Sequence, residues 1–323
     1  MKKLFLTFVF AIVATLAAMA QQISVVSTTG ATSLYRTLQD AIEGADPGSV
    51  IYLPGGGFPI SDEVKITKKL TIIGIGHYVK SGNVDGITTI SGNLFFNDGS
   101  SSSAVMGCYI SGDVNIGDGG ASVNDVLIRY CNLNSVQVKN YTCMGIIANQ
   151  NYIRNICSFN YSNVTITNNV AGMIKEIDGG IVNNNIIFHG WAPLKNIKNS
   201  IVQNNIIIGM GSSEVGSEST FSDNIVLGNM RRFSWGENPI VIDVAWNDIF
   251  INFNGGAISP ASDFHFKEAY KQYENQVGIY AGDGFNDNQL APVPYIVAKR
   301  VDEQTDASGK LNVKIRVKAS GDE

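Results

Sequence analysis

The sequence predicts an all-β fold, a parallel β-helix solenoid, and two observations support this prediction. An asparagine returns at a nearly fixed interval, and an apolar run rich in Ile, Val and Leu usually follows it. Such a period is typical of repeat architectures, in which one turn cannot bury its inner face alone and must stack on its neighbours. At intervals of 19, 18, 16, 20, 19 and 23 residues, the repeating positions are Asn132, Asn151, Asn169, Asn185, Asn205, Asn224 and Asn247.

These asparagines have a structural interpretation. Asn tolerates the left-handed backbone conformation that tight bends between sheets require better than other residues with a side chain. Stacked Asn side chains can also hydrogen-bond to one another and to the backbone of the turns above and below. We therefore interpret the repeat as a structural ladder and not as a ligand-binding array.

The first twenty residues form a segment of their own. Two lysines are followed by an apolar run over residues 4–16, and the small-x-small sequence Ala18-Met19-Ala20 precedes Gln21. This pattern predicts a secretory signal peptide over residues 1–20. A transmembrane anchor fits less well, because the apolar run is short and no stop-transfer charges follow it. We expect an exported mature chain without a transmembrane segment, placed outside the cell, in the periplasm or on the cell surface.

Charge and cysteine content exclude several classes. The net charge is −5 with 16% charged residues, and no basic patch or basic helix stands out. Nucleic acid and anionic membrane surfaces are therefore poor candidates as partners. No pair of the four cysteines has the C-x-x-C spacing of a zinc site. We expect buried thiols, free or stacked on one another, with Cys108 and Cys131 about one turn apart.

The segment before the asparagines predicts an N-terminal cap. Residues 33–45 carry one apolar stripe at helical spacing, with Ser33 as a plausible N-cap and Asp46-Pro47-Gly48 as the stop. Short strands are expected at residues 49–53, 64–66 and 70–73. At the other end, residues 295–301 and 311–317 predict a hairpin that covers the open end of the solenoid, since open ends invite edge-to-edge aggregation. An export or attachment tail is the alternative for residues 286–323.

Three stretches carry a resemblance to a known family. Residues 37–42 (TLQDAI), 46–55 (DPGSVIYLPG) and 66–74 (ITKKLTIIG) resemble the N-terminal cap and first coil of right-handed parallel β-helix proteins with the pectate-lyase-like fold. Residues 262–267 (SDFHFK) and 278–282 (GIYAG) resemble the closing coil of secreted bacterial β-helix proteins. The resemblance implies a right-handed β-helix over residues 21–285 and a polysaccharide as the partner.

The resemblance transfers the fold and not a catalytic set. Family members are commonly lyases, with an Arg or Lys base and Ca²⁺, or hydrolases with paired carboxylates. The hydrolase motifs Asn-Thr-Asp, Asp-Asp, Gly-His-Gly and Arg-Ile-Lys are absent, as are the lyase motifs Asp-His and Arg-x-Pro-x-x-Arg. No cofactor motif is present. Asp98, Asp113 and Asp118 are too scattered to predict a metal site, and Ca²⁺ is expected only if the chain is a lyase.

Rare functional residue types gather in neighbouring coils, whose loops can share one groove because stacked strands lie about 4.8 Å apart. A histidine there could act as a base, a lysine could offset a carboxylate, and a tryptophan could stack on a sugar ring. An ordinary polar surface with packed aromatics fits the same spacing. The candidates are His189, Lys195, Glu214, Arg231 and Arg232 as catalytic residues, and Trp191 and Trp235 as carbohydrate-binding residues.

Three functional hypotheses remain, and fold alone does not choose between them. The first is an exported, non-catalytic β-helix protein that binds a polysaccharide or cell-surface glycan, or displays a surface. The second is a polysaccharide lyase or glycoside hydrolase with an active site that its motifs do not reveal. The third is a purely structural role, as an adhesin or surface-layer component. The oligomeric state is open.

Overall fold

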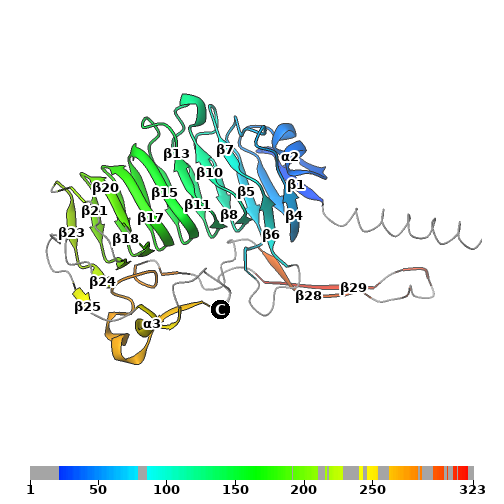
Figure 1. Cartoon of the computed structure of the whole chain (residues 1–323). Coiled ribbons are helices and arrows are strands. Elements are labelled where there is room, and N and C mark those ends of the chain that lie inside the picture. The colour runs from blue at the N-terminus through cyan, green and yellow to red at the C-terminus, as the bar shows by residue number, and fades with distance from the viewer. Residues whose placement is uncertain are drawn as a thin grey trace, which may run out of the picture.

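The computed structural model describes residues 22–78, 86–190, 192–209, 215–216, 218–227, 240–242, 246–253, 262–282, 284–285, 294–301, 304, 308–310 and 312–318. The chain winds into a parallel β-solenoid of about eight turns, and Figure 1 shows the coils stacked along one axis. The predicted all-β, parallel β-helix architecture is therefore confirmed. The expected signal peptide lies outside the described residues. None of the described helices is long and apolar enough to cross a membrane.

One sheet forms the first face of the solenoid. Its strands run parallel from β3 onward, whereas β1 pairs antiparallel with both β2 and β3. In spatial order the strands are β2 (Thr32–Tyr35), β1 (Ile23–Val26), β3 (Val50–Leu53), β5 (Thr71–Gly74), β8 (Ala104–Met106), β11 (Leu127–Arg129), β14 (Ile146–Asn149), β16 (Val164–Thr167), β18 (Ile181–Asn183), β21 (Ile201–Gln203) and β23 (Thr220–Ser222).

A second sheet supplies two further faces, because β15 (Tyr152–Ser162) and β17 (Val170–Asp178) are long enough to bend from one face to the other. The second face comprises their first halves with β4 (Gly56–Pro59), β6 (Thr88–Ser91), β9 (Tyr109–Ile110), β12 (Asn132–Leu133), β19 (Ile186–Phe188), β22 (Ile206–Ile208), β24 (Ile225–Leu227) and β25 (Ile240–Ile242). The third face comprises their second halves with β7 (Leu94–Phe96), β10 (Val114–Ile116), β13 (Val136–Val138) and β20 (Leu194–Lys198).

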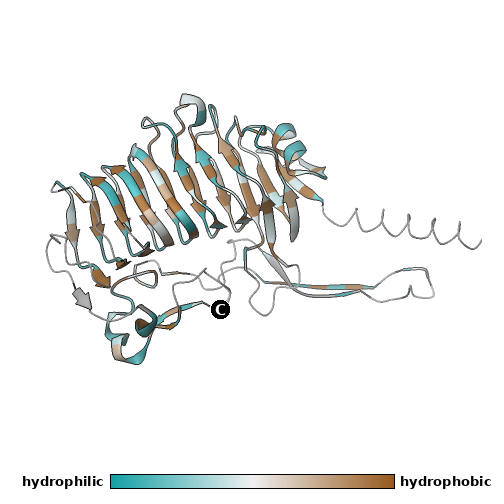
Figure 2. Ribbon diagram, in the orientation of Figure 1, coloured by the Kyte–Doolittle hydropathy of each residue, from teal (hydrophilic) through white to brown (hydrophobic). Residues whose placement is uncertain are grey.

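The core lies inside the coils and follows from alternation along each strand. On the first face, Ile128, Ala148 and Ile166 are in register on consecutive coils, and all three side chains are buried. The second and third faces send Ile, Val and Leu inward in the same way. Figure 2 shows brown apolar segments on the strands of every coil. Each coil thus buries its inner face only by contact with the coils on either side.

A buried column of asparagines marks the corner between the first and second faces. The side-chain Oδ1 of Asn185 accepts hydrogen bonds from the backbone N–H (2.9 Å) and the Nδ2 (3.1 Å) of Asn169 on the preceding coil. Its own Nδ2 donates to Ile166 O and to the next Oδ1 in the column. The members of this ladder are Asn151, Asn169, Asn185, Asn205 and Asn224, and all five are essentially inaccessible to solvent.

Two predicted positions lie outside the ladder. Asn132 pairs with Tyr152 on β15, so the ladder position of that coil is Cys131, whose backbone N–H donates to Asn151 Oδ1. The Asn132 side chain instead accepts from Arg154. Asn247 lies in the short helix α3 (Trp246–Ile249) and is exposed. The repeat thus continues toward the N-terminus through residues other than Asn, and it ends before α3.

The left-handed conformation belongs to the residue before each ladder position and not to the ladder residue itself. Asn168, Asn184 and Asn204 have φ values of 55°, 56° and 54°. The two residues of each pair therefore have different roles. The first makes the bend, and the second forms hydrogen bonds with the backbone groups that the bend exposes. The recurrent Asn-Asn pairs meet both requirements.

The cysteines are free and buried, as expected. Cys108 lies in register with Cys131, so the two occupy successive levels of the same column as the asparagines. Burial raises the pKa of the Cys131 thiol to about 12. Burial also raises the pKa of Cys108, and the neighbouring Cys131 raises it further. Both thiols therefore stay protonated and unreactive near neutral pH.

The N-terminal cap differs in detail from the prediction. Helix α2 (Leu38–Gly44) begins at Thr37, whose side chain accepts from the N–H of Asp40, whereas Ser33 lies in β2. The apolar stripe of the helix is buried, as predicted. Residues 64–66 do not form a strand; only Ile66 makes an isolated bridge, with Phe96. Pairing of β2 with β1 shortens the helix, because residues 32–35 are used as a strand.

The segment that resembles a closing coil packs on the outside of the solenoid. We call the described part of residues 246–285 the strap. It contains α3, β26 (Phe250–Asn252), β27 (Asp263–Phe266) and the 3-10 helix η2 (Glu268–Tyr273). Its aromatic side chains form a second hydrophobic cluster with the outward-facing Val170, Ile186, Ile206 and Ile225 of the second face. The strap therefore covers a face and does not add a coil.

The C-terminal hairpin forms as predicted from β28 (Tyr295–Val301) and β29 (Val313–Lys318). Its place differs from the expectation. Figure 1 shows the hairpin toward the N-terminal end of the solenoid, well away from β25 at the other end. Val313, Ile315 and Val317 are each at least half exposed. The apolar face of β29 therefore does not cover the last coil.

The ladder predicts a large stability effect for Asn185→Ala. The change leaves the buried N–H of Asn169 and the carbonyl of Ile166 without partners, at about 1–3 kcal/mol per group. We expect the free energy of unfolding to fall by about 3 kcal/mol, measured by urea denaturation. The exposed Asn163→Ala is the control and should cost less than about 1 kcal/mol. Equal effects of the two changes would contradict the ladder.

Docking of the strap predicts a local effect for Gly278→Ala. Gly278 has φ 74°, and a Cβ there would lie 2.5 Å from Ile206 Cδ1. We expect faster proteolytic cleavage of residues 262–285, while the solenoid stays folded. Gly284→Ala is the matched control, because its φ is 72° but the nearest atom is 3.9 Å away. If both variants are cleaved at the same rate, backbone strain and not docking explains the effect.

Candidate functional site

The third face carries a row of outward-pointing polar residues, one on each of several consecutive coils. Strand pairing places Gln137, Ser158, Lys175 and Lys195 in register, starting from Asn115 on β10, which is itself buried. We call these five residues the polar row. Their neighbours along the strands, including Val136, Cys157, Ile174 and Leu194, point inward and are fully buried. Alternation thus fixes the row rigidly on the solenoid.

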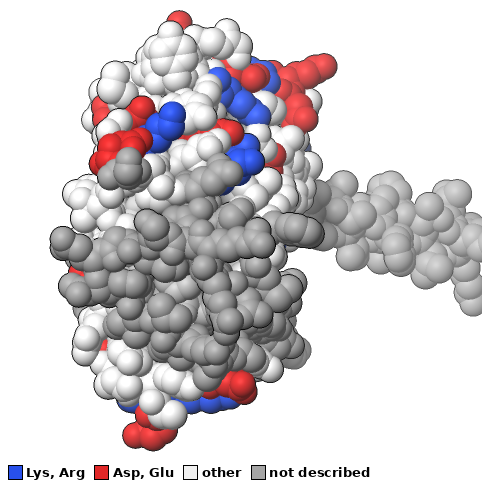
Figure 3. All heavy atoms as spheres, turned by 60° about the vertical axis from the view of Figure 1, so that its left-hand side comes forward, with Lys and Arg blue, Asp and Glu red and all other residues white. Residues whose placement is uncertain are grey.

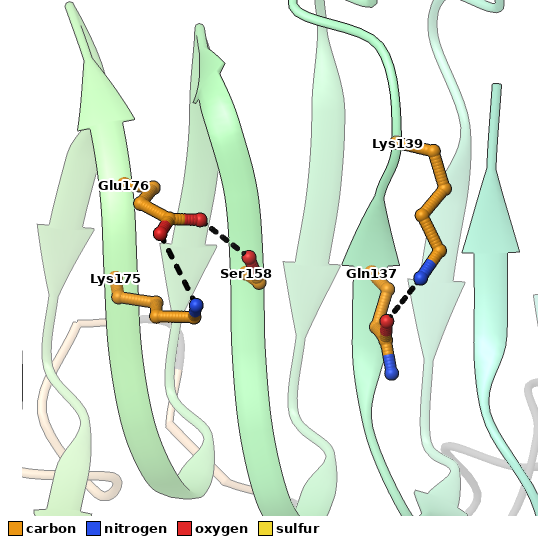
Figure 4. A network of polar contacts seen from close by, with 5 residues as sticks. All are labelled: Gln137, Lys139, Ser158, Lys175 and Glu176. Atoms are coloured by element: carbon orange, nitrogen blue, oxygen red, sulfur yellow. Dashed lines mark hydrogen bonds and ion pairs between the residues drawn. The ribbon is translucent and has the colours of Figure 1, made fainter. Parts of the chain in front are cut away.

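Hydrogen bonds connect the row with Glu176 where it crosses β15 and β17. Glu176 has φ 62°, and its carboxylate accepts from Ser158 Oγ (2.8 Å) and from Lys175 Nζ (3.1 Å). Figure 4 shows this carboxylate bridging β15 and β17. The Lys175 and Glu176 side chains are 28% and 26% exposed, so the cluster is reachable from solvent.

The charge state of Glu176 follows from these contacts. Partial burial acts to raise the pKa of the carboxyl, but hydrogen bonds from Ser158 and Lys175, together with the charges of Lys175 and Lys195, outweigh it and lower the pKa below 4.5. Glu176 is therefore ionised at neutral pH. An ionised, hydrogen-bonded carboxylate can orient a ligand or a cation, but it cannot donate a proton as a general acid.

A second group of hydrogen bonds lies on the coils of β10 and β13, nearer the N-terminal end of the solenoid. Gln137 Nε2 donates to Asp113 Oδ2 (2.6 Å), and its Oε1 accepts from Lys139 Nζ, the other contact drawn in Figure 4. Asn134 Nδ2 donates to Asp113 Oδ1 at 2.7 Å. The row therefore offers amide, hydroxyl and ammonium groups whose positions are set by neighbours on other coils.

Two exposed tyrosines border the row at the corner that leads to the first face. Tyr141 is 71% and Tyr161 is 42% exposed. They lie on adjacent coils, because Asn160 Nδ2 donates to Lys139 O at 2.8 Å and Tyr161 follows Asn160 directly. Asn160 and Tyr161 both have positive φ, a conformation that residues with a side chain seldom adopt. Lys198 Nζ lies 5.5 Å from the Tyr161 ring centre.

Charges of both signs lie together here. In Figure 3, groups of blue and red atoms lie close together over the upper part of the molecule and are interspersed with uncharged surface. Asp178 and Lys198 are in register on β17 and β20, next to the Lys175–Lys195 pair. A mixed surface of this kind does not attract a polyanion by its net field, so recognition has to come from individual hydrogen bonds.

Two of the predicted catalytic residues are described. Lys195 is exposed and belongs to the polar row. His189 lies on the same coil, just after β19; its Nδ1 accepts from the N–H of Ala192 at 3.2 Å, and burial lowers the pKa of its ring. The remaining candidates, Trp191, Glu214, Arg231, Arg232 and Trp235, lie outside the described residues.

The other predicted sites have simpler surroundings. His77 is buried against the edge of Tyr152. His265 stacks on Tyr280 with ring centres 4.0 Å apart and contacts Glu274, so it packs within the strap. Among the described residues, no group of three or more His, Cys, Asp and Glu side chains could hold a metal ion.

Sequence reasoning missed most of the polar row. Its signal is a polar residue between buried neighbours on the third strand of a coil, as in Val136-Gln137-Val138. That signal is weak in one coil and becomes visible only when the coils are aligned. Comparisons with protein-family models, with curated proteins and with solved structures find no match. The function is therefore argued from the geometry of the third face.

The network predicts a pH effect for Ser158→Ala. Removing the hydroxyl donor should raise the pKa of Glu176, which NMR titration of its carboxyl carbon would measure. Ser122→Ala, an exposed serine elsewhere, is the control and should leave that pKa unchanged. An unchanged pKa in Ser158→Ala would show that the hydroxyl does not stabilise the carboxylate.

The same shift has a stability consequence with a definite sign. Because the folded pKa lies below the unfolded value, the ionised Glu176 stabilises the fold above the unfolded pKa, and this contribution disappears as the pH falls through the folded pKa. Glu176→Gln should therefore flatten the loss of stability on acidification below pH 4.5.

Proposed function

We propose that this protein is an exported β-helix protein that binds a polysaccharide or cell-surface glycan on its third face without cleaving it. The observation that carries the proposal is the polar row: hydrogen-bonding side chains held in register on consecutive coils. Stacked strands repeat about every 4.8 Å. An extended saccharide lying along the solenoid axis can therefore meet a donor or acceptor at each coil.

The tyrosines support the same proposal. Tyr141 and Tyr161 present ring surface at the edge of the row, where an apolar sugar face could stack. The positive φ of Tyr161 holds its ring outward at the cost of backbone strain, and such strain concentrates at functional positions. Stacking on a sugar ring is also the role that the sequence suggested for Trp191 and Trp235.

The non-catalytic part of the proposal rests on two carboxylates of this face, Glu176 and Asp113. A glycosidase needs one carboxyl that is protonated before the reaction and a second carboxylate opposite it. Glu176 is ionised and already accepts two hydrogen bonds. Asp113 is likewise engaged by Asn134 and Gln137. Both carboxylates are thus arranged to hold the face in shape.

A lyase is the second candidate, and one observation favours it. Burial lowers the pKa of the His189 ring, so the imidazole is neutral near pH 7, and it can accept a proton once its Nδ1 releases the N–H of Ala192. In that case Lys195, six residues further along the same coil, would neutralise the substrate carboxylate. Ca²⁺ would be required only under this alternative.

The test is a binding screen of the mature protein against a panel of polysaccharides, with every hit examined for shortened chains and new unsaturated ends. We expect binding without cleavage, and about tenfold weaker binding in Lys175→Met and in Lys195→Met, since hydrogen bonds from charged groups contribute about 1.5–3 kcal/mol. Tyr161→Ala should weaken binding as well.

Matched controls separate the third face from general effects. Lys69→Met removes an exposed lysine just before β5, on a coil that does not contribute to the polar row, and Tyr52→Ala removes a first-face tyrosine that is 39% exposed. Neither should change affinity. Binding that survives all third-face substitutions would contradict the site, absence of any binding would contradict the function, and cleavage lost in His189→Ala would establish the lyase.

A further inference from the structure

Strand β29 of the C-terminal hairpin has two chemically different sides. Along β29, Val313, Ile315 and Val317 point to one side and are 50%, 53% and 56% exposed. Lys314, Arg316 and Lys318 alternate with them and point to the other side. In register, Arg300 of β28 lies opposite Lys314, whereas Lys299 lies opposite Ile315, so β28 adds one basic position to each side of the hairpin.

The apolar side needs a cover. A two-stranded hairpin is only marginally stable in water by itself, and exposed aliphatic side chains at alternate positions are typical of a surface that meets a partner. The described solenoid does not provide the cover, since all three aliphatic side chains are exposed in its presence.

Charge identifies the partner. Between residues 295 and 318 the sequence has six basic residues and three acidic ones, and the acidic residues Asp302, Glu303 and Asp306 all lie in the connection between the strands. The strands themselves carry only basic charge. The partner should therefore be anionic and should also offer an apolar phase.

We infer that the hairpin binds the surface of an anionic lipid membrane, with its aliphatic side in the acyl boundary and its basic side at the headgroups. Lysine and arginine side chains can reach back to the headgroup level while their stems lie among apolar groups. The net charge of −5 for the whole chain does not reveal this surface, because its basic residues are confined to one hairpin, where they alternate with aliphatic residues. This proposal departs from the expectation, based on the overall charge, that anionic membranes are poor partners.

Other partners fit less well. A nucleic acid or soluble polyanion would match the basic side but leave the aliphatic side in water. A second copy of the chain would cover the aliphatic side, but a stable protein interface takes about 20–30 residues from each partner. Three aliphatic side chains are far fewer than that.

The test is co-sedimentation of the full chain with vesicles of phosphatidylcholine alone and vesicles that also contain phosphatidylglycerol. We expect at least about tenfold tighter binding to the anionic vesicles, weakened by salt. The triple change Lys314→Gln, Arg316→Gln and Lys318→Gln should remove this preference. The triple change Val313→Ser, Ile315→Ser and Val317→Ser should abolish the binding that remains at high salt.

The charge-matched control is Arg36→Gln, Lys69→Gln and Lys267→Gln, three exposed basic residues away from the hairpin. Equal binding to both vesicles, or equal loss in the control and the hairpin variant, would overturn the inference. A third result would also overturn it. If dextran sulfate displaces the protein from the vesicles, and the triple serine variant binds the vesicles as tightly as the unchanged protein, the basic side is a polyanion site.

A second measurement guards against variants that lose the hairpin itself. An environment-sensitive fluorophore is attached to Ile315→Cys or to Arg316→Cys; the native cysteines are buried and should not react. Anionic vesicles should shift the emission of the label at position 315 to shorter wavelength, and more than at position 316. Equal or absent shifts would overturn the proposed orientation.

Discussion

The fold depends on satisfying the backbone at one corner of every coil. Where the chain turns from the first face to the second, it leaves the strand ladder, and its N–H and C=O groups are buried within the stack. Each ladder asparagine accepts from the backbone of the preceding coil and donates to a carbonyl of that coil, and from Asn169 onward it also donates to a carbonyl of its own coil, as Asn205 does with Asn185, Val182 and Gln203. An unsatisfied group here would cost as much as a lost hydrogen bond, repeated at every coil.

The same requirement explains why the column changes composition toward the N-terminus. Register continues the column from Asn151 through Cys131 and Cys108 to Thr88. The hydroxyl of Thr88 accepts from the N–H of Ile75 and donates to the carbonyl of Pro54, so it serves both roles of the amide with one oxygen. A small side chain suffices because Gly74 lies against it: a Cβ there would be 2.7 Å from the Thr88 Cβ. The first and second faces of this coil therefore approach closely at the corner.

Sequence reasoning predicted the solenoid because the asparagine period and the apolar runs are local signals. It placed Asn132 in the ladder because Asn132 also precedes an apolar residue; only strand pairing reveals that Cys131 holds the position. Residues 262–267 of the strap resemble a closing coil in sequence, because their aromatic pattern does not tell whether the aromatic side chains face the inside or the outside of the stack. Inward burial and outward covering use the same residue types.

The candidate site was harder to predict for a related reason. Whether Lys175 and Lys195 become neighbours depends on the length of the loops between β17 and β20, since one residue more or less would turn a side chain from solvent to core. What distinguishes the third face from the second is that no described segment covers it. The strap buries the outward Val170 and Ile186 of the second face, whereas the outward Gln137, Ser158, Lys175 and Lys195 of the third face are half-exposed or exposed. Selection of polar residues on a face that nothing in the described chain covers is what a ligand-binding surface requires, and stability alone would not demand it.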